Sequence, residues 1–227
     1  MKLIIFDLDH TLVDVFWLHD QTTQKMFRKY FGKDAWLHEI DHAGRSQPDG
    51  LHVLALAKGV QEEVFQQKIP EMIQEFYDQF VADLPADSTR FILPGAVALL
   101  EKLTQGGSIP VLYTGDSPIV GQGILKATGL GRYFVYRFFG TEFARRPDMI
   151  RAAITKIKEV TGREFTGRDI AVVGDSVRDV ECGKEFGGIT IAVATGQHTP
   201  EQLAKANPDL LVKSLTEIEK IMETLKM

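Results

Sequence analysis

The chain has 227 residues, of which 44% are hydrophobic and 25% are charged, and its formal net charge is -5. This composition is typical of a globular protein with one large domain, or with a core domain and a smaller insert. The negative charge supplies no basic field for a nucleic-acid backbone, so it disfavours nucleic-acid binding. Cys182 is the only cysteine and cannot form an internal disulfide, and no apolar run approaches the roughly 20 residues that span a bilayer. We therefore expect a cytoplasmic protein without a membrane partner.

Short, continuous apolar runs predict buried parallel strands. In chain order the runs cover residues 3–6, 109–113, 133–139, 170–173, 189–193 and 210–212, and the third and last are the weakest. Helical patterns lie between most of them, at residues 96–104, 117–128, 148–161, 177–186, 200–206 and 215–225. Strand alternating with helix indicates an α/β fold with a Rossmann-like parallel sheet and right-handed crossovers.

One interval, between residues 15 and 90, breaks this alternation because it contains no good strand candidate. Residues 16–30 and 61–81 have amphipathic helical patterns, and a stretch rich in glycine, aspartate and proline separates them at residues 44–50. We interpret the interval as an inserted α-helical cap domain. The predicted boundaries are 15–87 for the cap and 1–14 with 88–227 for the core.

Polar residues gather where four core segments end. The first strand ends in DLDHT from Asp7, and the second ends in TGDS from Thr114. The sequence RRP precedes a predicted helix from Arg145, and GDSVRD follows a later strand from Gly174. Ligands of open parallel sheets bind at the carboxyl ends of the strands. We therefore expect these four stretches to meet in one crevice.

In this order and spacing, the four stretches resemble the four motifs of the haloacid dehalogenase superfamily of aspartate-dependent phosphotransferases. The resemblance covers the whole chain, and the helical insert resembles the type 1 cap of phosphoglycolate-phosphatase-like members. It implies a Mg²⁺-dependent phosphatase that hydrolyses a small phosphorylated metabolite through an aspartyl-phosphate intermediate. The implied partner is a small-molecule phosphate ester, and the protein would be a monomer or a homodimer.

The physical chemistry of the first motif supports a metal ion. Asp7 and Asp9 cannot both be buried as anions without a counter-charge. Mg²⁺ prefers oxygen ligands, and Asp7 and Asp175 can supply carboxylates from adjacent strands. The resemblance adds the backbone carbonyl of Asp9 as a third ligand and places Asp179 behind the ligands, where it would orient them or a water molecule.

The resemblance also assigns the chemical steps. Asp7 would be the nucleophile, and Asp9 would protonate the leaving oxygen and then accept a proton from water. The Thr114 hydroxyl and the Gly115 amide would bind the phosphoryl oxygens. Two acids at a strand end also suit an ordinary turn, and Asp179 also suits a solvated first helical turn.

Two arginines extend this assignment. Arg146 stands where the family usually has a lysine, and we give it the role of the cation that faces the phosphoryl group, although its planar head differs from a lysine point charge. Arg45 lies in the predicted cap loop, where it would bind a second anionic group of the substrate. A solvated loop arginine explains Arg45 equally well, and a surface charge is the favoured reading of Arg145.

Other functions remain open from the sequence. A β-phosphoglucomutase-like phosphomutase shares the four motifs. A catalytically weak phosphate-binding module is supported only by the arginine at position 146. A dehalogenase is disfavoured by Asp9, and a phosphonatase by the lack of any signature around the cap lysines. The sequence does not identify the phosphorylated substrate.

Overall fold

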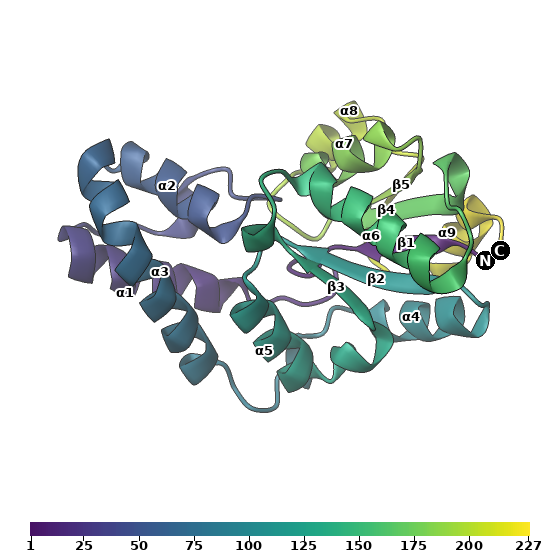
Figure 1. The fold of residues 1–227 in the computed structure, drawn as a ribbon, viewed down its shortest axis with the longest axis horizontal. Coiled ribbons are helices and arrows are strands. Elements are labelled where there is room, and N and C mark those ends of the chain that lie inside the picture. Colours follow the sequence, from purple (N-terminus) through teal and green to yellow (C-terminus); the bar gives the residue numbers. More distant parts are fainter.

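A six-stranded parallel sheet forms the centre of the computed structural model, which describes residues 1–227 (Figure 1). Its strands are β1 (Leu3–Phe6), β2 (Ile109–Thr114), β3 (Tyr136–Phe139), β4 (Ile170–Gly174), β5 (Ile189–Val193) and β6 (Leu210–Val212). The strand order is β3-β2-β1-β4-β5-β6, and every neighbouring pair is parallel. The predicted parallel α/β core is confirmed.

The helices are α1 (Phe16–Phe31), α2 (Gln47–Ala57), α3 (Glu62–Asp83), α4 (Ala96–Gln105), α5 (Pro118–Thr128), α6 (Arg146–Thr161), α7 (Val177–Glu185), α8 (Pro200–Lys205) and α9 (Ile218–Leu225). Short 3₁₀ turns lie at Leu37–Glu39, Thr89–Phe91, Leu130–Tyr133, Gly140–Glu142 and Gly167–Asp169. No helix combines the length and the apolar composition that crossing a membrane requires.

Strand β1 shows why the apolar runs are continuous. All four of its residues are fully buried, and their side chains alternate between the two faces of the sheet. Leu3 and Ile5 pack in one cluster with residues of α6, whereas Ile4 and Phe6 pack in the other cluster with residues of α4, α5 and α9. Because helices cover both faces, no strand position needs a polar residue.

Helices α1, α2 and α3 follow β1 directly and form the left-hand group in Figure 1. Phe27, Phe65, Phe76 and Phe80 are buried among them. Two expectations were wrong in detail. Helix α2 begins inside the predicted break because Pro48 lies in its first turn, where a missing N–H costs no helical hydrogen bond. Strand β3 covers only Tyr136–Phe139, because a 3₁₀ turn ends at Tyr133. The predicted domain boundaries stay a prediction.

The loop between α1 and α2 contacts core residues that lie far from it in the sequence. Arg178 Nη2 of α7 donates to Asp41 Oδ2 at 2.8 Å, and Gln197 Nε2 donates to the Ile40 carbonyl at 2.7 Å. Gly44 approaches α7 so closely that a Cβ atom would lie 2.7 Å from Ser176 Oγ. These contacts hold the loop over the carboxyl ends of the strands.

Candidate active site

Three neighbouring strands bring the sequence motifs together. Asp7 follows β1, Thr114 ends β2 and Asp175 follows β4, and β1 pairs with both β2 and β4. Their carboxyl ends therefore meet at one edge of the sheet. A cavity of about 80 Å³ lies there, between the core and the loop before α2. Of the predicted site residues, it is lined by Asp7, Asp9, Arg45, Thr114, Gly115, Arg146 and Asp175.

Arg146 connects the first and fourth motifs. Its Nη2 donates to Asp7 Oδ1 at 2.6 Å and to Asp179 Oδ1 at 2.6 Å, and its Nε donates to the same Asp179 oxygen at 3.1 Å. The guanidinium also lies over the ring of Tyr113, 4.2 Å from its centroid. Arg146, the predicted cation, thus contacts the carboxylate of Asp7, the predicted nucleophile.

Asp179 is buried rather than solvated, with 1% of its surface exposed, so its reading as a solvated first-turn acid was wrong. Its Oδ2 accepts hydrogen bonds from the Ser176 amide at 2.9 Å and the Ser176 hydroxyl at 2.6 Å, while the Tyr113 hydroxyl donates to Oδ1. Ser176 caps α7 in return, since its Oγ accepts from the Asp179 amide. A Cβ at Gly174 would lie 2.3 Å from Asp179, so this packing requires glycine there.

Carboxylate oxygens of Asp7, Asp175 and Asp179 lie within 4.8 Å of one another. Burial raises the pKa of Asp7 to about 7, against the opposing charge of Arg146, and the charges of Asp179 and Asp9 add to the rise. Burial, with the charges of Asp7 and Asp179, also raises the pKa of Asp175 well above its usual value. For Asp179 the cation Arg146 and the hydrogen bonds outweigh burial and lower the pKa. Arg146 alone therefore leaves Asp7 and Asp175 with too little positive charge.

This donor set suits Mg²⁺. It consists of buried oxygen ligands, and hard divalent cations prefer carboxylates and retained water. A metal ion would supply the charge that Asp7 and Asp175 lack. The fit rests on the burial and the raised pKa values of these two carboxyls.

Asp9 belongs to a second polar group, in which His19 of α1 and Asp116 also take part. His19 Nε2 lies 3.6 Å from Asp9 Oδ2 and 3.8 Å from Asp116 Oδ1. Asp9 Oδ1, His19 Nε2 and Asp116 Oδ2 are buried and have no hydrogen-bond partner in the protein. Burial and the Asp9 charge raise the pKa of Asp116, whereas His19 outweighs burial at Asp9 and lowers its pKa.

Sequence reasoning missed His19 and Asp116 as site residues. Asp116 carried a signal, because it is another acid directly after a predicted strand. His19 carried none, since a single histidine on a helix more often packs in a core, and here its ring lies 4.4 Å from that of Phe80. Tyr113 was also missed because it reads as an ordinary strand residue.

Gln47 ties the loop before α2 to the second motif. Its backbone amide donates to the Gly115 carbonyl at 3.1 Å. Its side-chain Oε1 accepts from the Ser117 backbone amide at 3.2 Å, and its Nε2 lies 3.3 Å from His19 Nδ1. A Cβ at Gly115 would lie 2.0 Å from the Arg45 carbonyl oxygen. Arg45 itself lines the cavity and pairs with Asp49, with Nη1 and Oδ2 2.7 Å apart.

The comparisons with known proteins agree with the fold. Residues 1–187 match the protein family described as haloacid dehalogenase-like hydrolase. The phosphoglycolate phosphatase of Vibrio parahaemolyticus is 25% identical over 98% of this chain and 96% of its own. Among solved structures, β-phosphoglucomutase from Clostridium difficile has a TM-score of 0.80 at 18% identity, covering 100% of this chain and 97% of its own. A predicted phosphoglycolate phosphatase from Haemophilus somnus has a TM-score of 0.76 at 20% identity, covering 98% of both chains.

Proposed function

Because this chain belongs to the haloacid dehalogenase-like hydrolases, we propose that it is a Mg²⁺-dependent phosphatase that uses Asp7 as its nucleophile. The substrate is a small phosphorylated metabolite, since the cavity lies beneath the loop before α2 and has little room. Phosphoglycolate is the first candidate, because the matched relative from Vibrio parahaemolyticus carries that name.

In the first step, an Asp7 carboxylate oxygen attacks phosphorus and the ester P–O bond breaks. Asp9 protonates the leaving oxygen. Because the pKa of Asp9 is lowered, the proton comes from its neighbour Asp116, whose pKa is raised. In the second step, water attacks the phosphorus of the aspartyl-phosphate while Asp9 accepts a proton from that water. The bond between phosphorus and the Asp7 oxygen then breaks, and inorganic phosphate leaves.

Other residues of the cavity hold the phosphoryl group. The Thr114 hydroxyl and the Gly115 amide donate to its oxygens, and the Arg146 guanidinium balances the charge that builds up on them. Asp7, Asp175 and the Asp9 backbone carbonyl would hold Mg²⁺, with Asp179 orienting them. A bound Mg²⁺ supplies charge neutralisation and aligns the phosphoryl group with Asp7.

The observation that carries this proposal is the position of Asp7. Its carboxylate is buried at a strand end, contacts Arg146 at 2.6 Å and shares an oxygen cluster with Asp175. A buried carboxylate with a purely structural role requires one cation and does not require a cavity beside it. The geometry thus supports nucleophilic phosphoryl transfer better than a structural role.

The test is phosphate release from a panel of aryl, sugar and organic-acid phosphates, with and without Mg²⁺. We expect Mg²⁺-dependent release that Asp7→Asn abolishes. Turnover that survives Asp7→Asn would contradict the proposal, and tight phosphate binding without turnover would favour the phosphate-binding module.

A phosphomutase is the second candidate, because the β-phosphoglucomutase structure covers the whole chain with a TM-score of 0.80. It would move phosphate between two positions of one sugar without releasing it. Following ³¹P spectra of sugar 1-phosphates separates the two activities. A cytoplasmic location, a monomeric or homodimeric state and the absence of nucleic-acid and membrane partners remain predictions.

A further inference from the structure

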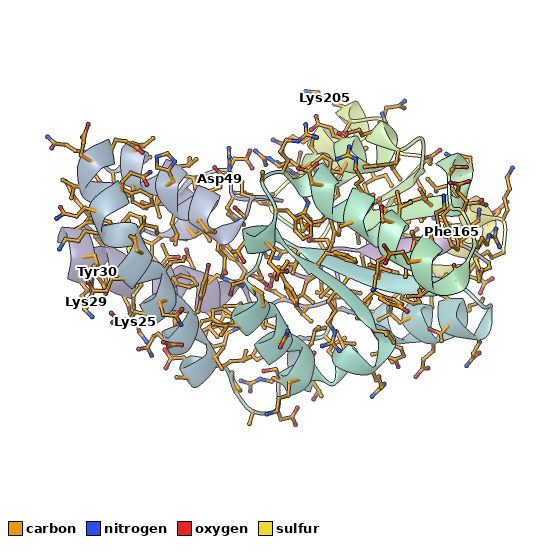
Figure 2. All side chains as sticks on the ribbon, in the orientation of Figure 1. Lys25, Lys29, Tyr30, Asp49, Phe165 and Lys205 are labelled. Carbon is orange, nitrogen blue, oxygen red and sulfur yellow. The ribbon has the colours of Figure 1, made fainter.

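A second cavity, of about 290 Å³, lies beside the first at the seam between the core and the loop before α2. Its lining includes four arginines and only one carboxylate, that of Asp49. We call it the arginine pocket and define it by Arg45, Arg145, Arg146 and Arg178. Asp49, labelled in Figure 2, lies in the first turn of α2, at the end of this helix nearest the core.

The arginine pocket is continuous with the phosphoryl site. Gly44, Arg45, Ser46, Gly115 and Arg146 line both cavities. Arg146 contacts Asp7 from one side and faces the arginine pocket from the other. One small ligand can therefore reach from the nucleophile into the arginine pocket.

Two of the arginines are largely engaged by the protein itself. Arg178 donates to both carboxylate oxygens of Asp41 and to the Ala43 carbonyl. Arg45 donates to Asp49 and to the Asp41 carbonyl. These bonds fix the loop before α2. They leave some N–H donors of Arg45 and Arg178 unused, because each guanidinium has five N–H groups.

Arg145 is different, because its ion pairs with the protein are long. Its nearest carboxylate oxygens belong to Asp148 at 3.5 Å and Glu185 at 3.8 Å, and 61% of its side chain is exposed. It directly precedes α6, whose N-terminus has no side-chain cap, so the helix dipole adds partial positive charge at the same place. A loosely paired guanidinium in a cationic pocket beside a phosphoryl site suits a ligand anion.

We propose that the arginine pocket binds a second anionic group, a carboxylate or a phosphate, of the ester whose phosphoryl group lies at Asp7. The inference rests on the proposed function and narrows the substrate class to small phosphate esters that carry two anionic groups. Arg145 is the specificity-determining residue of this pocket, since its donors are the least occupied.

The test compares matched substrates that differ only in the second charge. Three pairs serve: phosphoglycolate with 2-hydroxyethyl phosphate, 3-phosphoglycerate with glycerol 3-phosphate, and fructose 1,6-bisphosphate with fructose 6-phosphate. We expect kcat/KM to favour the doubly anionic member of at least one pair. In Arg145→Gln this preference falls roughly five- to tenfold, because one partly exposed guanidinium is lost, and kcat/KM for the singly anionic member stays the same.

Arg151→Gln is the matched control. Arg151 lies on α6, which Arg145 directly precedes. It is similarly exposed and also pairs with Asp148 and Glu185, but it does not line the arginine pocket. We expect it to leave the preference unchanged. Equal losses for both members of a pair in Arg145→Gln, or equal effects of the two substitutions, would overturn the inference.

Two further measurements distinguish this inference from binding of the released phosphate and from failure of the proposed function. Inorganic phosphate inhibits at the phosphoryl site, so Arg145→Gln should leave its inhibition constant unchanged. If only that constant rises, the pocket takes the released phosphate and the inference is wrong. If the wild-type protein hydrolyses nothing, the proposed function fails by itself. Calorimetric titration of both members of each pair into Asp7→Asn protein, with and without Arg145→Gln, then tests whether the pocket binds the second anionic group.

Discussion

Arg146 and Asp179 are joined by two hydrogen bonds to a single oxygen: Nη2 and Nε of the guanidinium lie 2.6 and 3.1 Å from Asp179 Oδ1. The same Nη2 also reaches Asp7. Asp179 therefore fixes the direction in which Arg146 presents its charge to the nucleophile. A planar guanidinium can contact two carboxylates at once, whereas a lysine offers a point charge.

Substitution of Arg146 tests this bridging role. We expect Arg146→Lys to lower kcat/KM about tenfold, because the ammonium keeps the charge and loses the second hydrogen bond to Asp179 that Nε makes. Arg146→Gln should lower it about a thousandfold, because no cation then faces the phosphoryl oxygens. Steady-state kinetics on one substrate check both values. Equal losses in the two variants would contradict the bridging role.

Asp179→Asn should destabilise the fold. It leaves the buried Arg146 cation with only one of its two carboxylate partners, and breaking a buried ion pair costs about 3–5 kcal/mol. Tyr113→Phe is the control, since it removes one hydrogen bond to Asp179 and keeps the ion pair; the expected cost is about 1–2 kcal/mol. Urea unfolding measures both. A smaller loss for Asp179→Asn than for Tyr113→Phe would be inconsistent with this ion pair.

Part of this arrangement could be read from the sequence, and part could not. Continuous apolar runs predicted the strands. Acids after two of them and Thr114 at the end of a third predicted which side chains meet, because parallel strands end at one edge. The partners of those acids depend on tertiary contacts. The Tyr113 hydroxyl reaches Asp179 across the sheet, and His19 reaches Asp9 from an insert helix. Helix α2 as a whole was missed, and its first-turn proline is the local reason, since it reads as a break.

Binding of Mg²⁺ should depend on pH through Asp7. Its pKa of about 7 in the folded protein exceeds the usual 3.8, so between these pH values the folded protein holds a proton that the unfolded chain has lost. Without metal, the free energy of unfolding therefore falls as pH rises across that window. Mg²⁺ must displace this proton and any proton on Asp175, whose pKa is also raised, so its affinity should increase with pH through about 7.

Calorimetric titration of Mg²⁺, from about pH 5.5 to about pH 8.5 in buffers of different ionisation enthalpy, measures the affinity and the protons released. Asp7→Asn should bind Mg²⁺ more weakly and with much less pH dependence. An affinity that stays constant with pH in the wild-type protein would show that Asp7 is not a ligand.

Gly115→Ala should disturb the loop before α2 without unfolding the core. The new Cβ would lie 2.0 Å from the Arg45 carbonyl oxygen, so the loop must move away from the cavity. We expect kcat/KM to fall at least about tenfold with little change in melting temperature. Gly131→Ala is the control, because the nearest atom that its Cβ would meet is the end of the Arg137 side chain, at 3.3 Å. Full activity of Gly115→Ala would mean that the loop need not contact Gly115 during turnover.

The central claim is that Asp7 carries the phosphoryl group during turnover. Acid quenching of the enzyme while it hydrolyses an aryl phosphate, followed by peptide mass spectrometry, tests this directly. Asp9→Asn protein should accumulate more of the intermediate, because hydrolysis of the acyl phosphate lacks its base. We predict that the peptide containing Asp7 gains one phosphoryl group, which hydroxylamine removes. A phosphoryl group on another residue, or turnover that never phosphorylates this peptide, would contradict the account.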